Sequence, residues 1–508
     1  MTQLSASGDA GTASDSRGAR AGHGWRTLGI ASLAVLATFL DTTALFVAFG
    51  DIAATFDSVS TAELSWVLNA YTIAIAALLV PAGKVADRFG HKRAFLAGSV
   101  LFTTASLACA AAPTAGVLVA FRVLQAAGAA ALIPSSFALV LRAFPRDKLP
   151  VAVALWGATG ALAGALGPTL AASLIELASW RWIFLLNLPV GVVTVGLGLR
   201  TLDESRDPAS RIPAAFGIAT IAATGALGSF GVVQSDTWGW GDLRTVASLS
   251  AAMALLALFV AHQRRTDAPV LDLELFSVRN FRWANAAMAA FGLAFAAMFF
   301  GSILFLTDVW QWSTLKAGFG VSPGPLLVAV LAPTFGRLAG RIGQRPLLVV
   351  GGLAFACGGL WRVLALGAQA DYATDYLPSI LFTGLGVALC FPQLSSTVGQ
   401  ALPPNRLGVG GAASQAIRQF GGTLGVALTI AMIGRPSTLA AALAGFERVW
   451  WLLVAGGLAT SLLSLALETR PTPTSGQASS SVSSPDPVDR NRSRSFMPGP
   501  ATARTSPS

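Results

Sequence analysis

Charged residues are scarce in this sequence. Only 11% of its 508 residues are Asp, Glu, Lys or Arg, whereas soluble proteins carry about 25%. A soluble chain of this length can bury an apolar core, but it also needs a charged surface, and too few charges are present to build one. The shortage therefore excludes an ordinary soluble protein.

Cysteine and histidine are also rare. The three cysteines lie in apolar runs without metal-ligand spacing or a CxxC pair, so we interpret them as small core residues and expect no metal site: Cys109, Cys357 and Cys390. The three histidines fall in predicted loops or the N-terminal tail, so no apolar run holds a Ser/His/Asp set: His23, His91 and His262. A GxxxxGK[ST] motif is absent, which excludes ATP as the power source within this chain. We therefore expect neither an enzyme nor a bound cofactor.

Basic residues outnumber acidic ones, and the net charge is +10. The basic residues occur in short loops and tails and form no patch interleaved with aromatic residues, so nucleic acid is not the expected partner.

Long apolar runs dominate the sequence instead. Apolar residues make up 54% of the chain, and about 20 consecutive, mostly apolar residues suffice to cross a bilayer. Fourteen such runs predict an all-α polytopic membrane protein, with spans near 28–49, 65–82, 94–112, 116–141, 151–177, 182–200, 212–233, 245–261, 284–306, 317–338, 347–368, 377–400, 407–434 and 449–468. The 53 glycines suit helices that approach one another closely in lipid.

The distribution of basic residues predicts the orientation of these spans. An even number of spans places both termini on one face, and most of the 34 basic residues lie on that face. Five fall on the opposite face, namely Arg181, Arg244, Lys316, Arg435 and Arg448, and three fall inside spans, namely Arg122, Arg362 and Arg418. The positive-inside bias therefore predicts cytoplasmic termini. The polar N-terminal residues lack the layout of a secretory signal, and the sequence from about 471 has the composition of a disordered tail.

One loop pattern occurs twice. The frame G-x-x-A-x-R-x-G begins at Gly83 and again at Gly336. This spacing superimposes the first six spans on the last six and leaves two spans between them, which is a known transporter layout. The predicted organisation is an N-terminal tail (1–27), a six-helix half (28–203), two inserted helices (204–262), a cytoplasmic linker (263–283), a second six-helix half (284–470) and a C-terminal tail (471–508).

Several motifs resemble a known family. The loop GKVADRFGHKRAF at 83–95 resembles the loop signature of the major facilitator superfamily, with His91 where a basic Arg or Lys is usual. The run RVLQAAGAA at 122–130 is similar to the family's R-x-x-Q-G-x-G-A-A signature, with Ala126 in place of its first glycine. The run GATGALAGALGPTLAA at 157–172 resembles the glycine-proline signature of the antiporters in this superfamily.

Three further segments, at 40–43, 65–71 and 180–191, resemble the fourteen-helix drug:proton antiporter subfamily. The resemblance covers roughly residues 28–470. It implies two six-helix halves plus two extra central helices, in a bacterial inner-membrane exporter of drug-like or amphipathic compounds that is driven by protons. The expected partners are protons and a small molecule, with amphipathic cations expected to be transported better than anions, and the protein is expected to function as a monomer.

Asp41 is the one acidic residue that the predicted spans place well inside the membrane. A charge at that depth costs about 2.5–3.5 kcal/mol on insertion scales, so such residues are rare and usually functional. A carboxyl group that takes up and releases a proton is what a proton-coupled carrier requires. The alternative is a structural Asp that pairs with a neighbour and holds the first span in place.

Two intramembrane arginines each precede a glutamine. Arg122 and Gln125 lie one turn apart in the fourth span, and the resemblance implies a role for Arg122 in proton transfer with Asp41. Arg418 and Gln419 raise the same question in the thirteenth span. A buried guanidinium needs a partner or a wet cavity, so the alternative role for each arginine is bonding to backbone carbonyls between helices.

The first copy of the repeated loop is interpreted as a conformational latch rather than a substrate site, with residues Gly83, Asp87, Arg88, Gly90 and Lys92. The two glycines are expected to form a tight turn, and Asp87 is expected to accept hydrogen bonds from a helix N-terminus. The second copy has Gly340 in place of the acid, so a single latch is expected. The alternative is a solvated charge cluster that only sets topology.

In the fifth span, Gly160, Gly164, Gly167 and Pro168 predict a close, bendable helix contact. Four polar residues are candidates for lining a cavity: Asn69, Tyr71, Gln125 and Asn187. The alternating residues of 263–282 suggest an interfacial helix that joins the halves.

Four functions remain open at this point. The leading one is a secondary exporter that works by alternating access. The others are a transporter-like protein without proton coupling, which handles lipid or regulates; a membrane enzyme, against which the histidine positions argue; and a channel, for which no filter motif or ring of charge is present.

Overall fold

The computed structural model describes residues 8–145, 149–206, 211–402, 406–434 and 436–468. Over these ranges the chain is helical and forms no β-strand. The membrane core is built from α1 (Gly8–Thr55), α3 (Trp66–Phe89), α4 (His91–Ala110), α5 (Ala115–Ala143), α6 (Leu149–Leu177), α7 (Arg181–Leu185), α8 (Asn187–Thr201), α9 (Ala215–Trp238), α10 (Leu243–Gln263), α11 (Arg279–Leu304), α12 (Thr314–Val321), α13 (Pro323–Ile342), α14 (Gln344–Ala365), α15 (Leu377–Ala401), α16 (Leu407–Ile433) and α17 (Leu439–Leu465). Short helical turns complete it: α2 (Thr61–Leu64), η1 (Leu273–Ser277), η2 (Phe305–Val309) and η3 (Tyr372–Tyr376).

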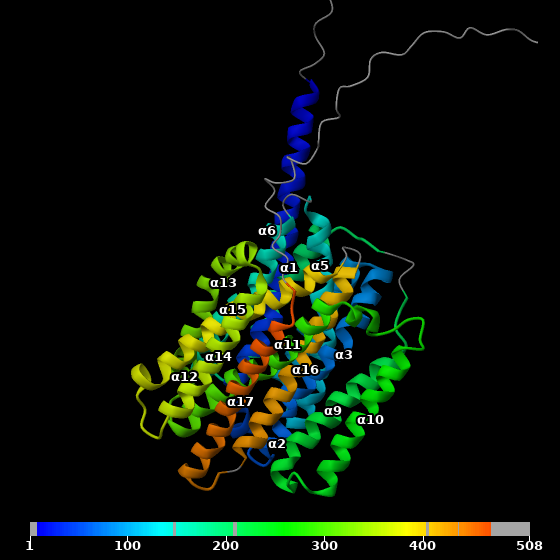
Figure 1. Cartoon of the computed structure of the whole chain (residues 1–508). Helices are drawn as coiled ribbons and strands as arrows, with labels where there is room; N and C mark the ends of the chain where they lie inside the picture. Colours follow the sequence, from blue (N-terminus) through cyan, green and yellow to red (C-terminus); the bar gives the residue numbers. More distant parts are fainter. Residues whose placement is uncertain (1–7, 146–148, 207–210, 403–405, 435, 469–508) are drawn as a thin grey trace, which may run out of the picture. The chain divides into compact units, whose positions relative to one another are not determined.

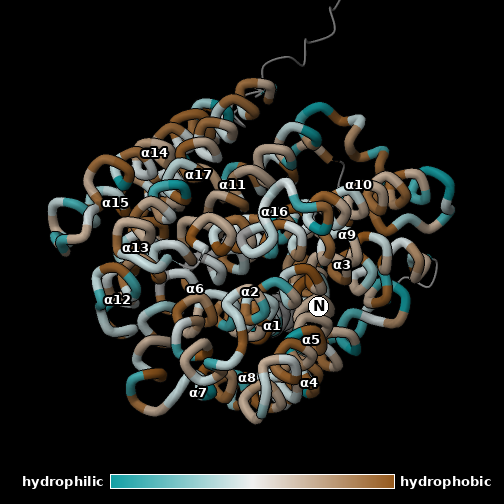
Figure 2. Tube along the Cα trace, turned by 90° about the horizontal axis from the view of Figure 1, so that it is seen from below, coloured by the Kyte–Doolittle hydropathy of each residue, from teal (hydrophilic) through white to brown (hydrophobic). Residues whose placement is uncertain are grey.

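The helices match the predicted spans in number and order. Among the described residues, thirteen helical segments are long and apolar enough to cross a membrane, and α6, which bends by 43° near Gly164, makes a fourteenth. The predicted span 317–338 divides into α12 and α13 at Pro323, which cannot donate a backbone hydrogen bond. The first helix starts upstream of the predicted boundary, at Gly8, inside the segment expected to be a tail. The most hydrophilic residues lie mainly in the connections between helices (Figure 2).

Two groups of helices pack mainly within themselves. Helices α1 and α3 to α8 form one group, and α11 to α17 form the other. The hairpin of α9 and α10 lies beside α3 and α16, along one side of the bundle (Figure 1). The two extra helices are therefore attached to the two-group core, at its edge.

Glycines allow very close helix contacts inside each group. A methyl group on Gly128 of α5 would lie 2.5 Å from the backbone nitrogen of Phe102 of α4. In the second group, a methyl group on Gly352 of α14 would lie 2.6 Å from the carbonyl oxygen of Gly457 of α17. Real Cβ atoms do not approach so closely, so these positions require glycine and each group is tightly packed.

Aromatic rings join the two groups near the C-terminal end of α1. Phe46 and Phe49 of α1 meet Phe299 and Phe300 of α11, with ring centroids 5.0–5.8 Å apart. We call these four residues the aromatic seal. Three hydrogen bonds also connect the groups within the described ranges. Thr314 Oγ1 donates to Asp51 Oδ2 at 3.1 Å, the hydroxyls of Thr169 and Ser322 lie 2.7 Å apart, and Thr423 Oγ1 donates to Thr72 Oγ1 at 2.6 Å.

The interpretation of 263–282 as an interfacial helix is wrong. This segment contains only the short helix η1 before α11 begins at Arg279. Gln263 Oε1 accepts hydrogen bonds from the backbone nitrogens of Val270 and Leu271, at 2.6 and 3.3 Å. Pro269, which lies between Gln263 and Val270, cannot donate a helical hydrogen bond. Val270 and Leu275 are buried. The alternating apolar residues therefore anchor an irregular linker.

Candidate functional site

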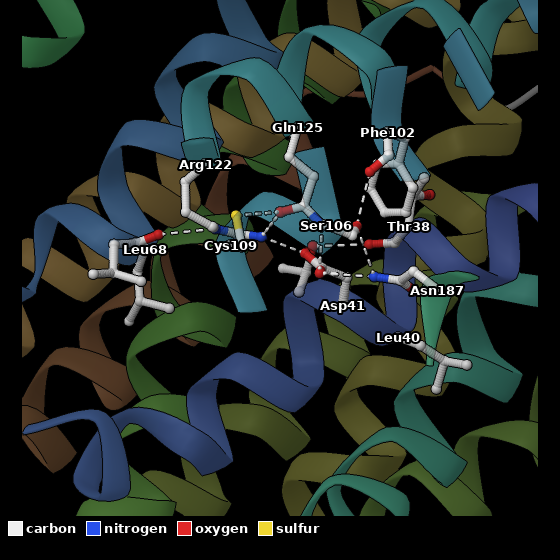
Figure 3. A network of polar contacts seen from close by, with 12 residues as sticks. Thr38, Leu40, Asp41, Leu68, Phe102, Ser106, Cys109, Arg122, Gln125 and Asn187 are labelled. Carbon is white, nitrogen blue, oxygen red and sulfur yellow. Dashed lines mark hydrogen bonds and ion pairs between the residues drawn. The ribbon is translucent and has the colours of Figure 1, made fainter. Parts of the chain in front are cut away.

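Asp41 is buried among polar partners from two other helices, α5 and α8 (Figure 3). The residue is 1% exposed. Arg122 Nη1 donates to Asp41 Oδ2 at 2.5 Å. Gln125 Nε2 and Asn187 Nδ2 donate to Oδ1, at 2.8 and 3.2 Å. The structure thus brings together four residues that the sequence indicated as separate site candidates.

Local helix geometry explains this convergence. Arg122 and Gln125 are three residues apart on α5 and therefore share one face. Asn187 is the first residue of α8, which directs its amide toward α1. Arg122 is also 1% exposed, its Nε donates to the carbonyl of Val67 at 3.2 Å, and its guanidinium lies 3.9 Å from the ring centroid of Tyr71.

Two residues of α4 that were not predicted to belong to a site, Ser106 and Cys109, complete the network. Ser106 Oγ accepts from Gln125 Nε2 at 2.7 Å and from Asn187 Nδ2 at 3.2 Å. Cys109 Sγ lies 3.9 Å from Gln125 Oε1. Cys109 is buried, as expected for a core residue, but it also borders the site. The one sequence feature that links Ser106 and Cys109 is their three-residue spacing, which places both on one face of a helix.

A cavity of about 60 Å³ lies between the two groups of helices, next to Arg122. Its lining includes Tyr71, Thr72 and Arg122 from the first group and Phe391, Arg418 and Gln419 from the second. Pockets for drug-sized ligands are about 300–1,000 Å³. The cavity therefore holds only a few water molecules in this arrangement, and a larger ligand requires the groups to separate.

A second, smaller void lies on the other side of Asp41. It measures about 10 Å³ and is lined by residues of α1, α6, α7 and α8, including Gly167 and Asn187. This volume is near the minimum that holds one water molecule. The carboxylate therefore lies between this void and Arg122, which separates it from the central cavity.

The remaining polar candidates differ in their placement. Arg418 is partly buried, its Nε donates to Gln415 Oε1 at 3.1 Å, and its guanidinium lies 5.6 Å from the ring centroid of Phe391. Gln419 lines the cavity beside it. Asn69 is buried, and among the described residues its side chain bonds only to Ser65, at 3.4 Å. It belongs neither to the network nor to the cavity lining.

The predicted latch loop differs from expectation in two respects. Gly83 lies inside α3, so only Gly90, with φ of +121°, makes the turn into α4. Asp87 Oδ1 lies 3.3 Å from His91 Nε2 and does not bond to a helix N-terminus. That position is taken by Glu204, which accepts from the backbone nitrogens of Lys92 and Arg93 at 3.1 and 3.2 Å.

The physical reason is the direct passage from α3 to α4. Asp87 is still within α3 and its side chain reaches only one turn forward, to His91. The chain after α8 crosses the start of α4 and supplies Glu204 there, where the helix dipole favours an anion. Lys92 Nζ donates to the carbonyl of Leu199 at 3.0 Å, and Arg88 is exposed.

The glycine-proline motif of α6 lies against both groups of helices. A methyl group on Gly167 would lie 3.1 Å from Thr43 Cβ, and one on Gly160 would contact Phe39, so both face α1. Gly164 lies near Pro325 of α13, and a methyl group on Gly318 of α12 would lie 2.8 Å from the carbonyl oxygen of Pro168. The motif is therefore a contact between the groups, at the bend of α6.

A second buried arginine was noted in the sequence only as a basic residue inside a span. Arg362 of α14 is 1% exposed. It donates to the hydroxyls of Ser302 and Ser379 at 2.7 and 3.2 Å. Its guanidinium lies 4.8 and 5.3 Å from the ring centroids of Trp450 and Tyr376. Within the described ranges no carboxylate approaches it within 4.0 Å.

Comparisons with known proteins agree with this arrangement. The sequence model of the family described as Major Facilitator Superfamily matches residues 31–426. The chain is 31% identical over 410 residues to the tetracenomycin C resistance and export protein of Streptomyces glaucescens. This alignment covers 80% of this chain and 75% of that protein. It is 33% identical over 404 residues to the multidrug resistance protein Stp of Mycobacterium tuberculosis, covering 79% and 74%. Multidrug export protein EmrB of Escherichia coli is 30% identical over 410 residues, covering 79% and 78%.

Solved structures show the same fold at low sequence identity. A D-xylose–proton symporter aligns with a TM-score of 0.63 at 16% identity, over 87% of this chain and 97% of its own. The human organic anion transporter MFSD10 aligns with a TM-score of 0.59 at 15% identity, over 86% and 99%.

Proposed function

Because the chain belongs to the major facilitator superfamily, we propose that it is a secondary transporter that exports small amphipathic compounds in exchange for protons. The three relatives described above are bacterial and are named for drug resistance or export. In this proposal the protein works as a monomer in a bacterial plasma membrane, with both termini on the cytoplasmic face.

One observation carries the proposal: a buried carboxylate, paired with a buried arginine, beside a cavity between two groups of helices. Protonation of Asp41 removes its charge and leaves Arg122 without its partner. A buried charge without a partner destabilises a structure by about 3–5 kcal/mol. Binding or release of one proton therefore changes which packing of the helices around Asp41 is most stable.

The contacts between the two groups support alternating access. The aromatic seal closes the end of the bundle where α1 terminates, and the bend of α6 faces the same interface. Separation at this end opens the cavity to the side opposite the termini. An inward proton supplies about 2.3 kcal/mol per 100 mV from the membrane potential, which drives the exchange.

The test uses inverted membrane vesicles with an imposed pH gradient, to which a panel of amphipathic dyes of either charge is added. With the wild-type protein, at least one dye is expected to collapse the gradient, and Asp41→Asn is expected to abolish the response. Asp57→Asn is the matched control, because Asp57 is exposed beyond the end of α1 and its loss is expected to leave the response intact.

Two outcomes contradict parts of the proposal. A response that persists in Asp41→Asn rejects this residue as the coupling site. Dye movement by the wild type without any change in the gradient supports the alternative, a transporter-like protein without proton coupling.

A further inference from the structure

The charge of the central cavity is positive. Arg122 and Arg418 both line it, and its lining holds no acidic residue in the part of the chain that the structure describes. The two arginines are not equivalent, because Arg122 is already paired with Asp41, which lies outside the cavity lining. The only hydrogen bond from the Arg418 side chain among the described residues goes to the neutral Gln415.

Arg418 therefore presents a free positive charge to the cavity. A guanidinium does not lose its proton in proteins, so its charge is constant through the transport cycle. A partly buried cation without a carboxylate attracts an anion and repels a second cation, and these forces are stronger away from bulk water. The cavity therefore favours a ligand with a negative group.

Aromatic rings flank the two arginines. Phe391 lies 5.6 Å from the Arg418 guanidinium and 5.0 Å from the ring centroid of Phe295, which also lines the cavity. Tyr71 lies against Arg122 on the opposite wall. Rings at these positions provide faces and edges on which a flat aromatic ligand packs.

We propose that this transporter selects amphipathic aromatic compounds that carry a negative charge, such as carboxylates or phenolates, and that Arg418 binds the charged group. The proposal rests on the transport function proposed above and specifies its substrate class. It replaces the amphipathic cation expected from the sequence, for which the described cavity lining provides no carboxylate.

The charge of the substrate determines the electrical character of the exchange. One monovalent cation exported for one imported proton moves no net charge. One monovalent anion exported for one imported proton moves two charges, and the membrane potential drives both of them.

Binding to the purified full-length protein tests the substrate class without requiring transport. The probes are three pyrene compounds of matched size, namely pyrenebutanoate, its methyl ester and a pyrenebutyl trimethylammonium ion. For the wild type, the carboxylate is expected to bind at least about tenfold more tightly than the ammonium ion, with the ester between them. This order is expected to disappear in Arg418→Gln and to persist in Arg418→Lys.

Two measurements separate binding from folding. Binding of the neutral ester is expected to be unchanged in Arg418→Gln, which shows that the cavity is intact. Arg448→Gln removes the same charge from an exposed site on α17 and is expected to retain the preference for the carboxylate.

The proposal is overturned if the ammonium ion binds as tightly as the carboxylate, or if Arg418→Gln keeps the wild-type order. Failure of the general function gives a different result. If the carboxylate binds through Arg418 but no compound affects the gradient in vesicles, the substrate class holds and proton coupling fails. If only the cation collapses the gradient, coupling holds and the substrate class fails.

Discussion

Each group of helices contains a fully buried arginine, but the two arginines have different partners. In the first group, Arg122 is paired with Asp41, a partner whose charge changes when it binds a proton. In the second group, Arg362 is held by two hydroxyls and two aromatic rings, none of which supplies a negative charge. Ala294 lies 253 residues after Asp41, the same offset as the repeated loop. The two copies have therefore diverged in chemistry, and only the first contains a buried ion pair among the described residues.

The largest effect is expected when one member of the Asp41–Arg122 ion pair is removed and the other remains. Arg122→Gln leaves the Asp41 carboxylate buried without its counter-charge, and the free energy of unfolding is expected to fall by about 3–5 kcal/mol. Combining it with Asp41→Asn is expected to restore most of that stability, because no buried charge remains. Thermal unfolding in detergent measures both. Equal losses in the single and double variants would show that packing, not charge, holds the site together.

The second prediction makes the same change in the other group. Arg362→Gln removes a buried cation together with its hydrogen bonds to Ser302 and Ser379, so the lost bonds and the relieved desolvation largely offset each other. We expect the free energy of unfolding to change by less than about 2 kcal/mol, with the vesicle response to substrate retained. Loss of the response in this variant would place Arg362 in the coupling mechanism and end the distinction between the two groups.

The third prediction concerns the contact that joins the groups. A double-mutant cycle of Phe49→Leu and Phe300→Leu is expected to give a coupling energy of about 0.5–1.5 kcal/mol, because their rings meet edge to face at 5.0 Å. The cycle is measured from thermal unfolding of the four proteins. A coupling energy near zero would mean that the two rings contribute only through the area that they bury.

The smallest effect is expected at the repeated loop. Glu204→Gln weakens the interaction with the N-terminus of α4 by about 0.3–1 kcal/mol, and the loss is expected to shrink as salt increases. Glu447→Gln is the control, because Glu447 is exposed in the third turn of α17 and forms no ion pair within the described ranges. An equal loss in both variants would indicate general surface electrostatics rather than a contact with α4.

Features that depend on a single segment could be predicted from the sequence. Each transmembrane helix supplies its own apolar residues, so the spans follow from composition alone. Asp41 was found because an acid inside an apolar run is unusual. Arg122 and Gln125 were found because of their spacing on one helix and their resemblance to a family motif.

Features that depend on which helices become neighbours could not be predicted. Ser106 is an ordinary serine in an apolar helix, and only the position of α4 beside α5 makes it a partner of Gln125. Glu204 reaches the start of α4 from a segment more than one hundred residues away. Gly83 fits a turn and a helix equally well by sequence, and the continuation of α3 to Phe89 decides between them.

The aromatic seal has a consequence for how this protein responds to its surroundings. Contacts between apolar rings are not screened by ions, whereas hydrophobic association weakens on cooling. The contact between these four rings is therefore expected to be insensitive to ionic strength and to weaken on cooling. We therefore expect cooling, rather than added salt, to shift the balance between the closed and the open arrangement of this end of the bundle.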